Sequence, residues 1–345
     1  FRDRLPGMPR FLILFVSIAL LGAPSARASD DLSSHRAEVR RALESAARGP
    51  LHADAAMRRL LDHPLAPWLE YARLRRGLGS LTPAQAEAFL RAPGSPAAGE
   101  LFREAWLNET LRRQDWAAFL RSWNDSQRLE LRCGWLQARL ASAPVDEALL
   151  ADIEATWRFG RSLPDRCDPA IAALQAAGRL TPALRWERIL LAAEAGEAGL
   201  MRFLARGLDE AGANRVRDYA AFLEAAHERA LSWPADERSR RIATLGLSRL
   251  ARTDPDAAET LLARLTPALR LGEAERGAVL YQIALWTAAS YGPDSARRLA
   301  AVPASVNDER LNEWRVREAM ARGHDGDALA AIEAMPEAQR VNPRW

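Results

Sequence analysis

The sequence contains no lysine, so arginine supplies all 48 of its basic residues. We attribute this to a GC-rich coding sequence rather than to a need for guanidinium chemistry. The chain also lacks the patterns G-x-x-x-x-G-K-[ST], G-x-G-x-x-G and G-x-S-x-G, which mark phosphate-binding loops, dinucleotide sites and serine hydrolases. We therefore expect no cofactor.

Residues that ligate metals or act as general bases are also scarce. The two cysteines have no histidine at a zinc-site spacing. No two histidines stand at i and i+4 among His35, His52, His63, His227 and His324. Acidic residues are plentiful but scattered, so they do not reveal the paired carboxylates of a glycosidase. From these residues alone we expect no metal site, assign no catalytic residue, and favour a scaffold or binding module over an enzyme.

Long apolar runs are missing as well. The longest, Phe11–Leu21, has eleven residues, against the ~20 that a transmembrane helix requires. It follows an arginine and precedes Ala26-Arg27-Ala28, the small-x-small pattern that signal peptidase cleaves. We predict a signal peptide over residues 1–28 and no transmembrane anchor; a buried core helix is the alternative. No cysteine follows the run, so we expect no lipid anchor.

Removal of a signal peptide would also remove the net positive charge. The whole chain carries +3, and residues 1–28 contain four arginines and one aspartate, which is also +3. The rest of the chain is therefore neutral, since 3 − 3 = 0. Its arginines are interleaved with acidic residues rather than clustered. We expect no nucleic-acid partner.

Both cysteines, Cys133 and Cys167, lie in the predicted mature chain. An even count in an exported protein favours a disulfide. Closing a loop of this length would stabilise the fold by ~4 kcal/mol on the chain-entropy account. Two free, buried thiols are the alternative.

Apolar residues recur at three- and four-residue spacing through nearly all of residues 33–335, the period of an amphipathic helix. No stretch alternates with period two for long enough to predict a sheet. The helices come in pairs joined by short turns, and a lone pair cannot bury its apolar face, whereas stacked pairs can. We predict an all-α, irregular superhelical array (an α-solenoid) of stacked helical hairpins over residues 29–345, with residues 92–99 as its longest loop.

Capping residues and glycines predict several helix ends. The predicted boundaries are a start at Thr181-Pro182 with an end at Gly196, a turn at Gln114-Asp115, a start at Thr253-Asp254-Pro255, and a start at Asn307 or Asp308 with an end at Gly323. Apolar residues expected to pack between the helices include Phe203, Met320 and Leu329.

Eleven tryptophans are a high count for this length. Four of them, Trp106, Trp186, Trp286 and Trp314, stand at apolar helical positions, so we expect them to pack between hairpins. The alternative is that a few line an open face and stack on sugar rings. The sequence does not show which tryptophans would contact sugar.

Several segments, in order, carry a resemblance that covers most of the chain from His63 onward. They are His63–Tyr71 (HPLAPWLEY), Phe102–Trp116 (FREAWLNETLRRQDW), the cysteine pair within Leu131–Cys133 and Arg166–Asp168, Leu184–Gly199 (LRWERILLAAEAGEAG) and Asn307–Gly323 (NDERLNEWRVREAMARG). Each is weak alone, but together they resemble the soluble lytic murein transglycosylases.

The resemblance implies a periplasmic enzyme that cuts peptidoglycan glycan strands between N-acetylmuramic acid and N-acetylglucosamine. In that family one glutamic acid protonates the glycosidic oxygen, and the muramyl 6-hydroxyl attacks to leave a 1,6-anhydro end. One acid suffices because the substrate supplies the nucleophile. The expected partners are glycan strands and proteins of cell-wall synthesis or turnover.

The family's catalytic motif, Glu-Ser followed about twenty residues later by Gly-Leu-Met-Gln, is not found in this sequence. Its one Glu-Ser pair, Glu44-Ser45, has no Gly-Leu-Met-Gln after it, so Glu44 is not expected to be a catalytic acid. We expect the chain to be the superhelical N-terminal part of such an enzyme, truncated before a lysozyme-like catalytic domain and inactive alone. The alternative is a non-catalytic periplasmic helical-repeat adaptor.

Overall fold

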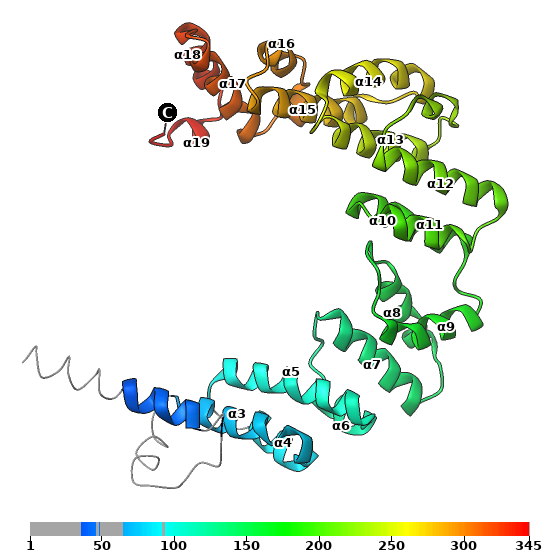
Figure 1. Ribbon diagram of the computed structural model, residues 1–345, viewed down its shortest axis with the longest axis vertical. Coiled ribbons are helices and arrows are strands. Elements are labelled where there is room, and N and C mark those ends of the chain that lie inside the picture. The colour runs from blue at the N-terminus through cyan, green and yellow to red at the C-terminus, as the bar shows by residue number, and fades with distance from the viewer. Residues whose placement is uncertain (1–35, 46–47, 49–64, 92–93, 345) are drawn as a thin grey trace, which may run out of the picture. The chain divides into compact units, whose positions relative to one another are not determined.

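The structure is a computed structural model that describes residues 36–45, 48, 65–91 and 94–344. The predicted signal peptide, residues 1–28, lies outside this part of the chain. The regular secondary structure of the described residues is entirely helical (Figure 1), which confirms the all-α prediction. No helix among them is long and apolar enough to cross a membrane. They form two compact units that divide between Ser122 and Trp123.

The first unit is built around one long helix, α5. Its elements are α3 (Ala66–Arg76), the 3-10 helix η1 (Leu78–Ser80), α4 (Pro83–Arg91), α5 (Pro96–Arg113) and α6 (Trp116–Ser122). Ser95 caps α5 by accepting a hydrogen bond from the backbone N–H of Ala98. The helix ends at Gln114, whose φ of +56° turns the chain into α6, at the predicted turn.

Trp106 anchors the core of this unit. Its side chain is fully buried and packs in one cluster with Leu74, Phe102 and Ala118. The indole N–H donates to the Ser122 hydroxyl at 3.1 Å, so the polar atom of this large side chain keeps a partner when buried. Trp106 therefore packs as expected.

The second unit holds a longer series of helices. In chain order they are α7 (Leu129–Ser142), α8 (Glu147–Trp157), η2 (Asp165–Cys167), α9 (Asp168–Ala176), α10 (Pro182–Ala195), α11 (Ala198–Ala205), α12 (Glu210–Glu224), η3 (Glu228–Ser232), α13 (Glu237–Leu250), α14 (Pro255–Leu269), α15 (Glu273–Ala289), α16 (Ser295–Ala300), η4 (Ala304–Val306), α17 (Glu309–Ala321), α18 (Asp325–Glu333) and α19 (Glu337–Arg340).

Helices of the second unit are stacked in series. From α10 to α18 each helix packs against the next, and α13 also packs against α15, and α15 against α17. Contact with the next-but-one helix is what a stack of hairpins produces. One apolar cluster runs from Leu136 on α7 to Ile283 on α15, with the rings of Tyr219, Phe222 and Trp233 packed edge to face within it. The predicted stack of hairpins is confirmed.

Most predicted helix boundaries are confirmed by their caps. The side chains of Thr181, Asp254 and Asp308 each accept a hydrogen bond from the backbone N–H three residues on. Gly196 and Gly323 lie beyond the ends of α10 and α17 with φ of +87° and +71°, values that glycine adopts without steric cost.

Two sequence predictions are wrong in part. The loop predicted over residues 92–99 is shorter, because Ser95 caps a helix that starts at Pro96. Several apolar side chains expected to pack are instead exposed at their surface: Phe203 (59%), Met320 (63%), Leu329 (58%) and Trp286 (36%). Helical spacing places them near the buried stripe without placing them inside it.

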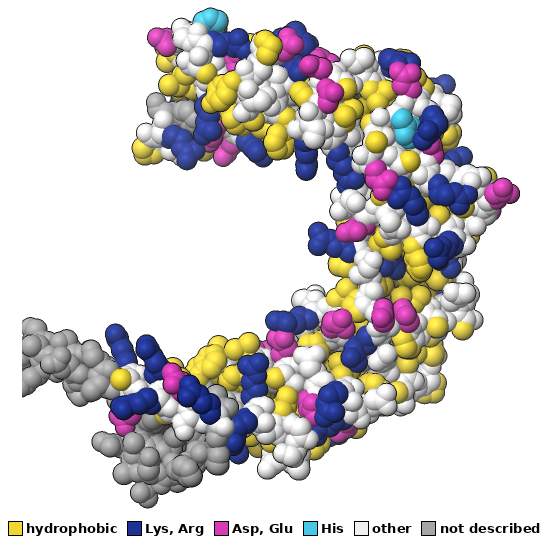
Figure 2. All heavy atoms as spheres, in the orientation of Figure 1, with side chains coloured by type: hydrophobic (Ala, Val, Ile, Leu, Met, Phe, Trp, Pro, Cys, Tyr) yellow, Lys and Arg dark blue, Asp and Glu magenta, His cyan; other side chains and the backbone are white. Residues whose placement is uncertain are grey.

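Arginines fasten the helix ends to their neighbours. Arginine side chains donate to backbone carbonyls at these junctions: Arg113 to Leu81, Arg188 to Phe159 and Arg161, Arg249 to Ala193, and Arg315 to Leu299. Ala193 and Leu299 lie in the last turns of α10 and α16, where carbonyls lack partners within the helix and carry negative partial charge, so a forked cation suits them. Leu81, Phe159 and Arg161 lie in the connections that follow η1 and α8. Other arginines pair with acids, and Figure 2 shows the two charges interspersed over the visible face.

Candidate functional site

The end of α15 carries an unusual turn. The backbone N–H of Gly292 donates to the Thr287 carbonyl at 2.9 Å, and that of Tyr291 to the Ala288 carbonyl at 3.0 Å. This is a Schellman motif, whose left-handed position is usually glycine. Here the position is Tyr291, with φ of +53°, at a cost of roughly 1–2 kcal/mol for a residue with a Cβ. The tyrosine is nevertheless 60% exposed, so burial of its ring does not repay that cost.

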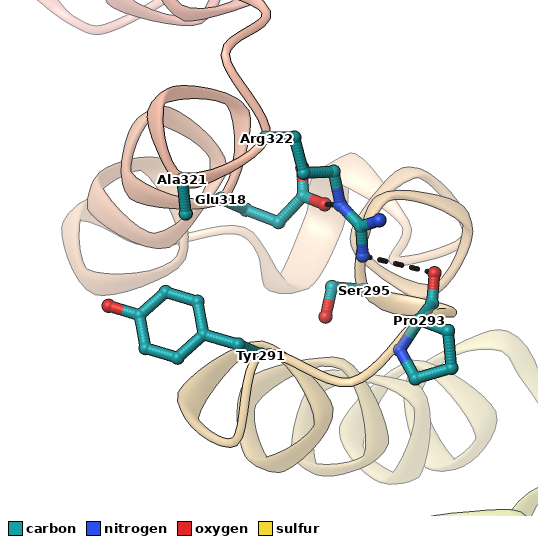
Figure 3. Close-up of a pocket in the computed structure, with 6 residues that line it drawn as sticks. All are labelled: Tyr291, Pro293, Ser295, Glu318, Ala321 and Arg322. Atoms are coloured by element: carbon teal, nitrogen blue, oxygen red, sulfur yellow. Dashed lines mark hydrogen bonds and ion pairs between the residues drawn. The ribbon is translucent and has the colours of Figure 1, made fainter.

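Tyr291 stands at the rim of a hollow between the ends of three helices. The hollow has a volume of about 460 Å³, within the range of roughly 300–1,000 Å³ typical of small-molecule sites. It is lined by Tyr291, Pro293, Ser295, Glu318, Ala321 and Arg322 (Figure 3). These residues come from the turn after α15, the start of α16 and the end of α17.

Arg322 forms the polar wall of the hollow. Its Nη2 donates to the carbonyls of Gly292 at 2.9 Å and Pro293 at 3.1 Å, and its Nε donates to the Glu318 carboxylate, as the dashed lines of Figure 3 show in part. These bonds use Nε and Nη2 of the guanidinium. In Figure 3 the Tyr291 ring lies across the hollow from Arg322, with Ser295 between them.

An ion network centred on the buried Arg298 adjoins the hollow through Thr287 and Ser295. Ser295 donates to the Gly292 carbonyl at 2.6 Å. Arg298, only 5% exposed, donates to the Thr287 hydroxyl at 2.9 Å and to the Glu259 carboxylate at 2.7 Å. Glu259 thereby ties α16 to α14, while Thr287 ties it to α15.

Glu259 is strongly stabilised in its charged form. A bidentate hydrogen bond from Arg297, at 2.6 and 2.9 Å, and a second from Arg298 lower the pKa of Glu259 to about 2, although burial opposes the shift. The carboxylate therefore stays ionised at any pH near neutrality.

The rim tyrosine is supported from behind by α17. The rings of Tyr291 and Trp314 meet edge to face at 6.2 Å, a favourable aromatic geometry. The guanidinium of Arg317 lies over the same indole at 5.4 Å. Trp314 is thus partly buried and holds Tyr291 from one side.

The arrangement suits binding better than catalysis. The one acid in the hollow, Glu318, already has a cationic partner in Arg322, so it is not placed as a free general acid or base. Among the described residues, no group of three or more His, Cys, Asp or Glu side chains is placed to hold a metal ion. The hollow offers an aromatic face, a guanidinium edge and small apolar walls.

Three residues that the sequence singled out lie elsewhere. Cys133 on α7 and Cys167 in η2 are both buried and form a disulfide, with their Cα atoms 4.8 Å apart. Glu44 is exposed on a helix and lies 3.5 Å from Arg48, one turn further on. This is an ordinary ion pair on a helix surface, and Glu44 does not have the burial of a catalytic acid.

The tryptophans divide between core and surface. Trp106 and Trp186 are buried, Trp314 is half-buried behind Tyr291, and Trp286 is exposed. Tyr291 itself was not singled out from the sequence. The signal that would have found it is the order Ser290-Tyr291-Gly292, in which the glycine comes one residue after the left-handed position.

A comparison with protein families finds no match, but individual relatives are found. The soluble lytic murein transglycosylase of Escherichia coli (strain K12) is 26% identical over 268 residues, covering 76% of this chain and 41% of that protein. The Salmonella typhimurium protein of the same name is 25% identical over 295 residues, covering 83% and 45%. An inactive mutant of the lytic transglycosylase Slt from Pseudomonas aeruginosa aligns with a TM-score of 0.66 and 29% identity, covering 89% of this chain and 51% of that one.

In sequence the chain is similar to these soluble lytic murein transglycosylases and to Slt. The fold agrees over a still larger part, since the 70 kDa soluble lytic transglycosylase from Escherichia coli aligns over 94% of this chain with a TM-score of 0.70. The chain spans less than half the length of the curated relatives. The similarity therefore extends over the helical array of this chain and assigns it no part in a reaction.

Proposed function

We propose that this chain is the glycan-holding superhelical part of a periplasmic lytic murein transglycosylase. The observation that carries the proposal is the 29% identity to the solved lytic transglycosylase Slt over 89% of this chain. The stacked helices would form a wall beside which peptidoglycan strands lie, and the Tyr291 hollow is a place where the wall has a shape suited to a ligand.

The proposed reaction of the whole enzyme is cleavage between N-acetylmuramic acid and N-acetylglucosamine. A carboxylic acid protonates the glycosidic oxygen, and the bond from that oxygen to the muramyl C1 breaks. The muramyl 6-hydroxyl then bonds to C1 and gives its proton to the carboxylate, which restores the acid. The product is a 1,6-anhydro end, and no water is consumed. The sequence has no Glu-Ser followed by Gly-Leu-Met-Gln, so we assign the acid to a lysozyme-like domain that this sequence does not include.

The test is to incubate the chain with purified murein sacculi and to sediment them. We expect the chain to sediment with sacculi, not with cellulose, and to release no 1,6-anhydro-muropeptides into the supernatant. Failure to bind sacculi would contradict the glycan-holding role and favour the periplasmic adaptor. Release of anhydro products by this chain alone would contradict the assignment of the acid to another domain.

A further inference from the structure

We propose that the hollow beside Tyr291 binds one pyranose ring of a β-linked N-acetylated amino sugar strand, with the sugar stacked on the Tyr291 ring. The choice of an amino sugar rests on the proposed function. The choice of a saccharide, and of this site, rests on the geometry of the hollow.

The backbone of Tyr291 gives the first reason. Other turns of the second unit place glycine in the left-handed region, at Gly178, Gly196 and Gly323. Four described residues with a side chain also have positive φ, and Tyr291 is the only aromatic among them. Strained backbone positions concentrate at ligand sites, where they hold a side chain in a useful place. This strain presents an exposed ring at the rim of a hollow.

The shape of the hollow gives the second reason. A pyranose ring has an apolar face of C–H groups and a rim of hydroxyls. An aromatic ring such as Tyr291 is a natural surface for the C–H face, as the negative face of an aromatic ring attracts C–H edges. Pro293 and Ala321 add small apolar walls that suit the methyl group of an N-acetyl substituent.

The charges of the hollow give the third reason. Sugar hydroxyls both donate and accept hydrogen bonds, so they need both kinds of partner. Arg322 brings the N–H donors of a guanidinium to the wall of the hollow, and the Glu318 carboxylate beside it is an acceptor. Because these two side chains form an ion pair, the site has little net charge for an anion. An uncharged polyol therefore fits better than a phosphate or a carboxylate.

The experiment is calorimetric titration of the full chain with chitotetraose, a soluble β-1,4 tetramer of N-acetylglucosamine, and with peptide-free murein glycan strands. We expect Tyr291→Gly to weaken binding of both by about tenfold or more, since the stacked face is lost. Tyr291→Phe keeps the ring, so we expect affinity within about twofold of the unchanged chain.

Two controls separate binding from folding. Phe203→Ala removes another aromatic, 59% exposed on α11, and should leave the affinity unchanged. Tyr291→Gly relieves the left-handed strain, so its melting temperature should equal or exceed that of the unchanged chain. A loss of binding in that variant is then a loss of contact and not of structure.

The outcomes distinguish this site from the proposed function. If the chain binds sacculi and Tyr291→Gly binds glycan equally well, the site is wrong and the function stands. If the chain binds chitotetraose through Tyr291 but not sacculi, the site stands and the glycan-holding function fails. If Tyr291→Phe loses as much as Tyr291→Gly, the hydroxyl and not the ring makes the contact, and the stacking proposal is overturned.

Discussion

The ends of α10 and α15 close with the same hydrogen bonds and yet differ in what surrounds them. At α10, Glu197 donates to Ala192 and Gly196 to Ala193; at α15, Gly292 donates to Thr287 and Tyr291 to Ala288. The left-handed residue is Gly196 in the first case and Tyr291 in the second. Glycine, the residue that this left-handed position favours, follows α10, whereas a tyrosine follows α15.

The spaces beside the two turns explain the difference. Arg249 fills the space at α10: it donates to the Ala193 carbonyl at 2.8 Å, and its Nη2 would lie 3.1 Å from a Cβ at position 196. At α15 the arginine is Arg322, which reaches the carbonyls beyond the turn and leaves a hollow. The filled space beside α10 leaves no room for a side chain at position 196, whereas the hollow beside α15 leaves room for the Tyr291 side chain.

The largest effect should come from the ion network that joins α16 to α14 and α15. Arg298→Met removes a buried cation from Glu259 and Thr287, and we expect it to lower the free energy of unfolding by about 3 kcal/mol. Urea denaturation measures this. The matched control is Arg297→Met, which touches the same Glu259 from a side chain that is 55% exposed and should cost less than about 1 kcal/mol. Equal losses would show that burial of Arg298 is not what matters.

The next largest effect should come from placing a tyrosine at position 196, where Arg249 fills the space beside the end of α10. Gly196→Tyr forces a side chain onto φ of +87° and against Arg249, and we expect a loss of about 2 kcal/mol in urea denaturation. Gly99→Ala is the control, because Gly99 lies within α5 and a Cβ there meets nothing within 4 Å. A harmless Gly196→Tyr would mean that the two ends do not differ in packing.

The free energy of unfolding should also depend on pH, because Glu259 of the ion network loses its charge in acid. The pKa of Glu259 is lowered to about 2, so its contribution is complete above the ordinary value near 4.5 and is lost as pH falls through about 2. Glu259 is 29% exposed, and with screening we expect roughly 1–2 kcal/mol. The difference in unfolding free energy between the unchanged chain and Glu259→Gln should shrink from pH 6 towards pH 2. For Glu228→Gln, at an exposed pair with Arg264, the difference should stay small throughout.

The sequence predicted the helices and many of their ends because the residues that cap a helix lie next to it in the chain. Thr181 and Asp254 each satisfy a backbone N–H three residues away, and glycine announces a left-handed turn. Period alone was a poorer guide to burial, since Leu329 and Met320 fit the apolar spacing but lie exposed. Whether such a residue is covered depends on which helix packs beside it.

The candidate site was harder to predict because its parts are distant in sequence. Tyr291 and Ser295 flank the connection from α15 to α16, whereas Arg322 follows α17, and only packing of α15, α16 and α17 brings Arg322 to the other two. Arg322 looks like any other arginine in a chain that has 48 of them. Its role follows from two carbonyls that it reaches across thirty residues of chain.

The smallest predicted effect is a gain in the free energy of unfolding, opposite in sign to the losses above. It compares the ends of α10 and α15 most directly. Tyr291→Gly gives α15 the left-handed residue that α10 already has, and we expect a gain of about 1 kcal/mol in the free energy of unfolding, reduced somewhat by the lost contact with Trp314. Urea denaturation beside Tyr291→Ala, which loses the ring but keeps the strain, isolates the backbone contribution. If Tyr291→Gly were no more stable than Tyr291→Ala, the turn would not be strained, and an exposed tyrosine there would need no explanation from function. A more stable Tyr291→Gly would mean that the natural residue gives up stability at a turn that borders a hollow.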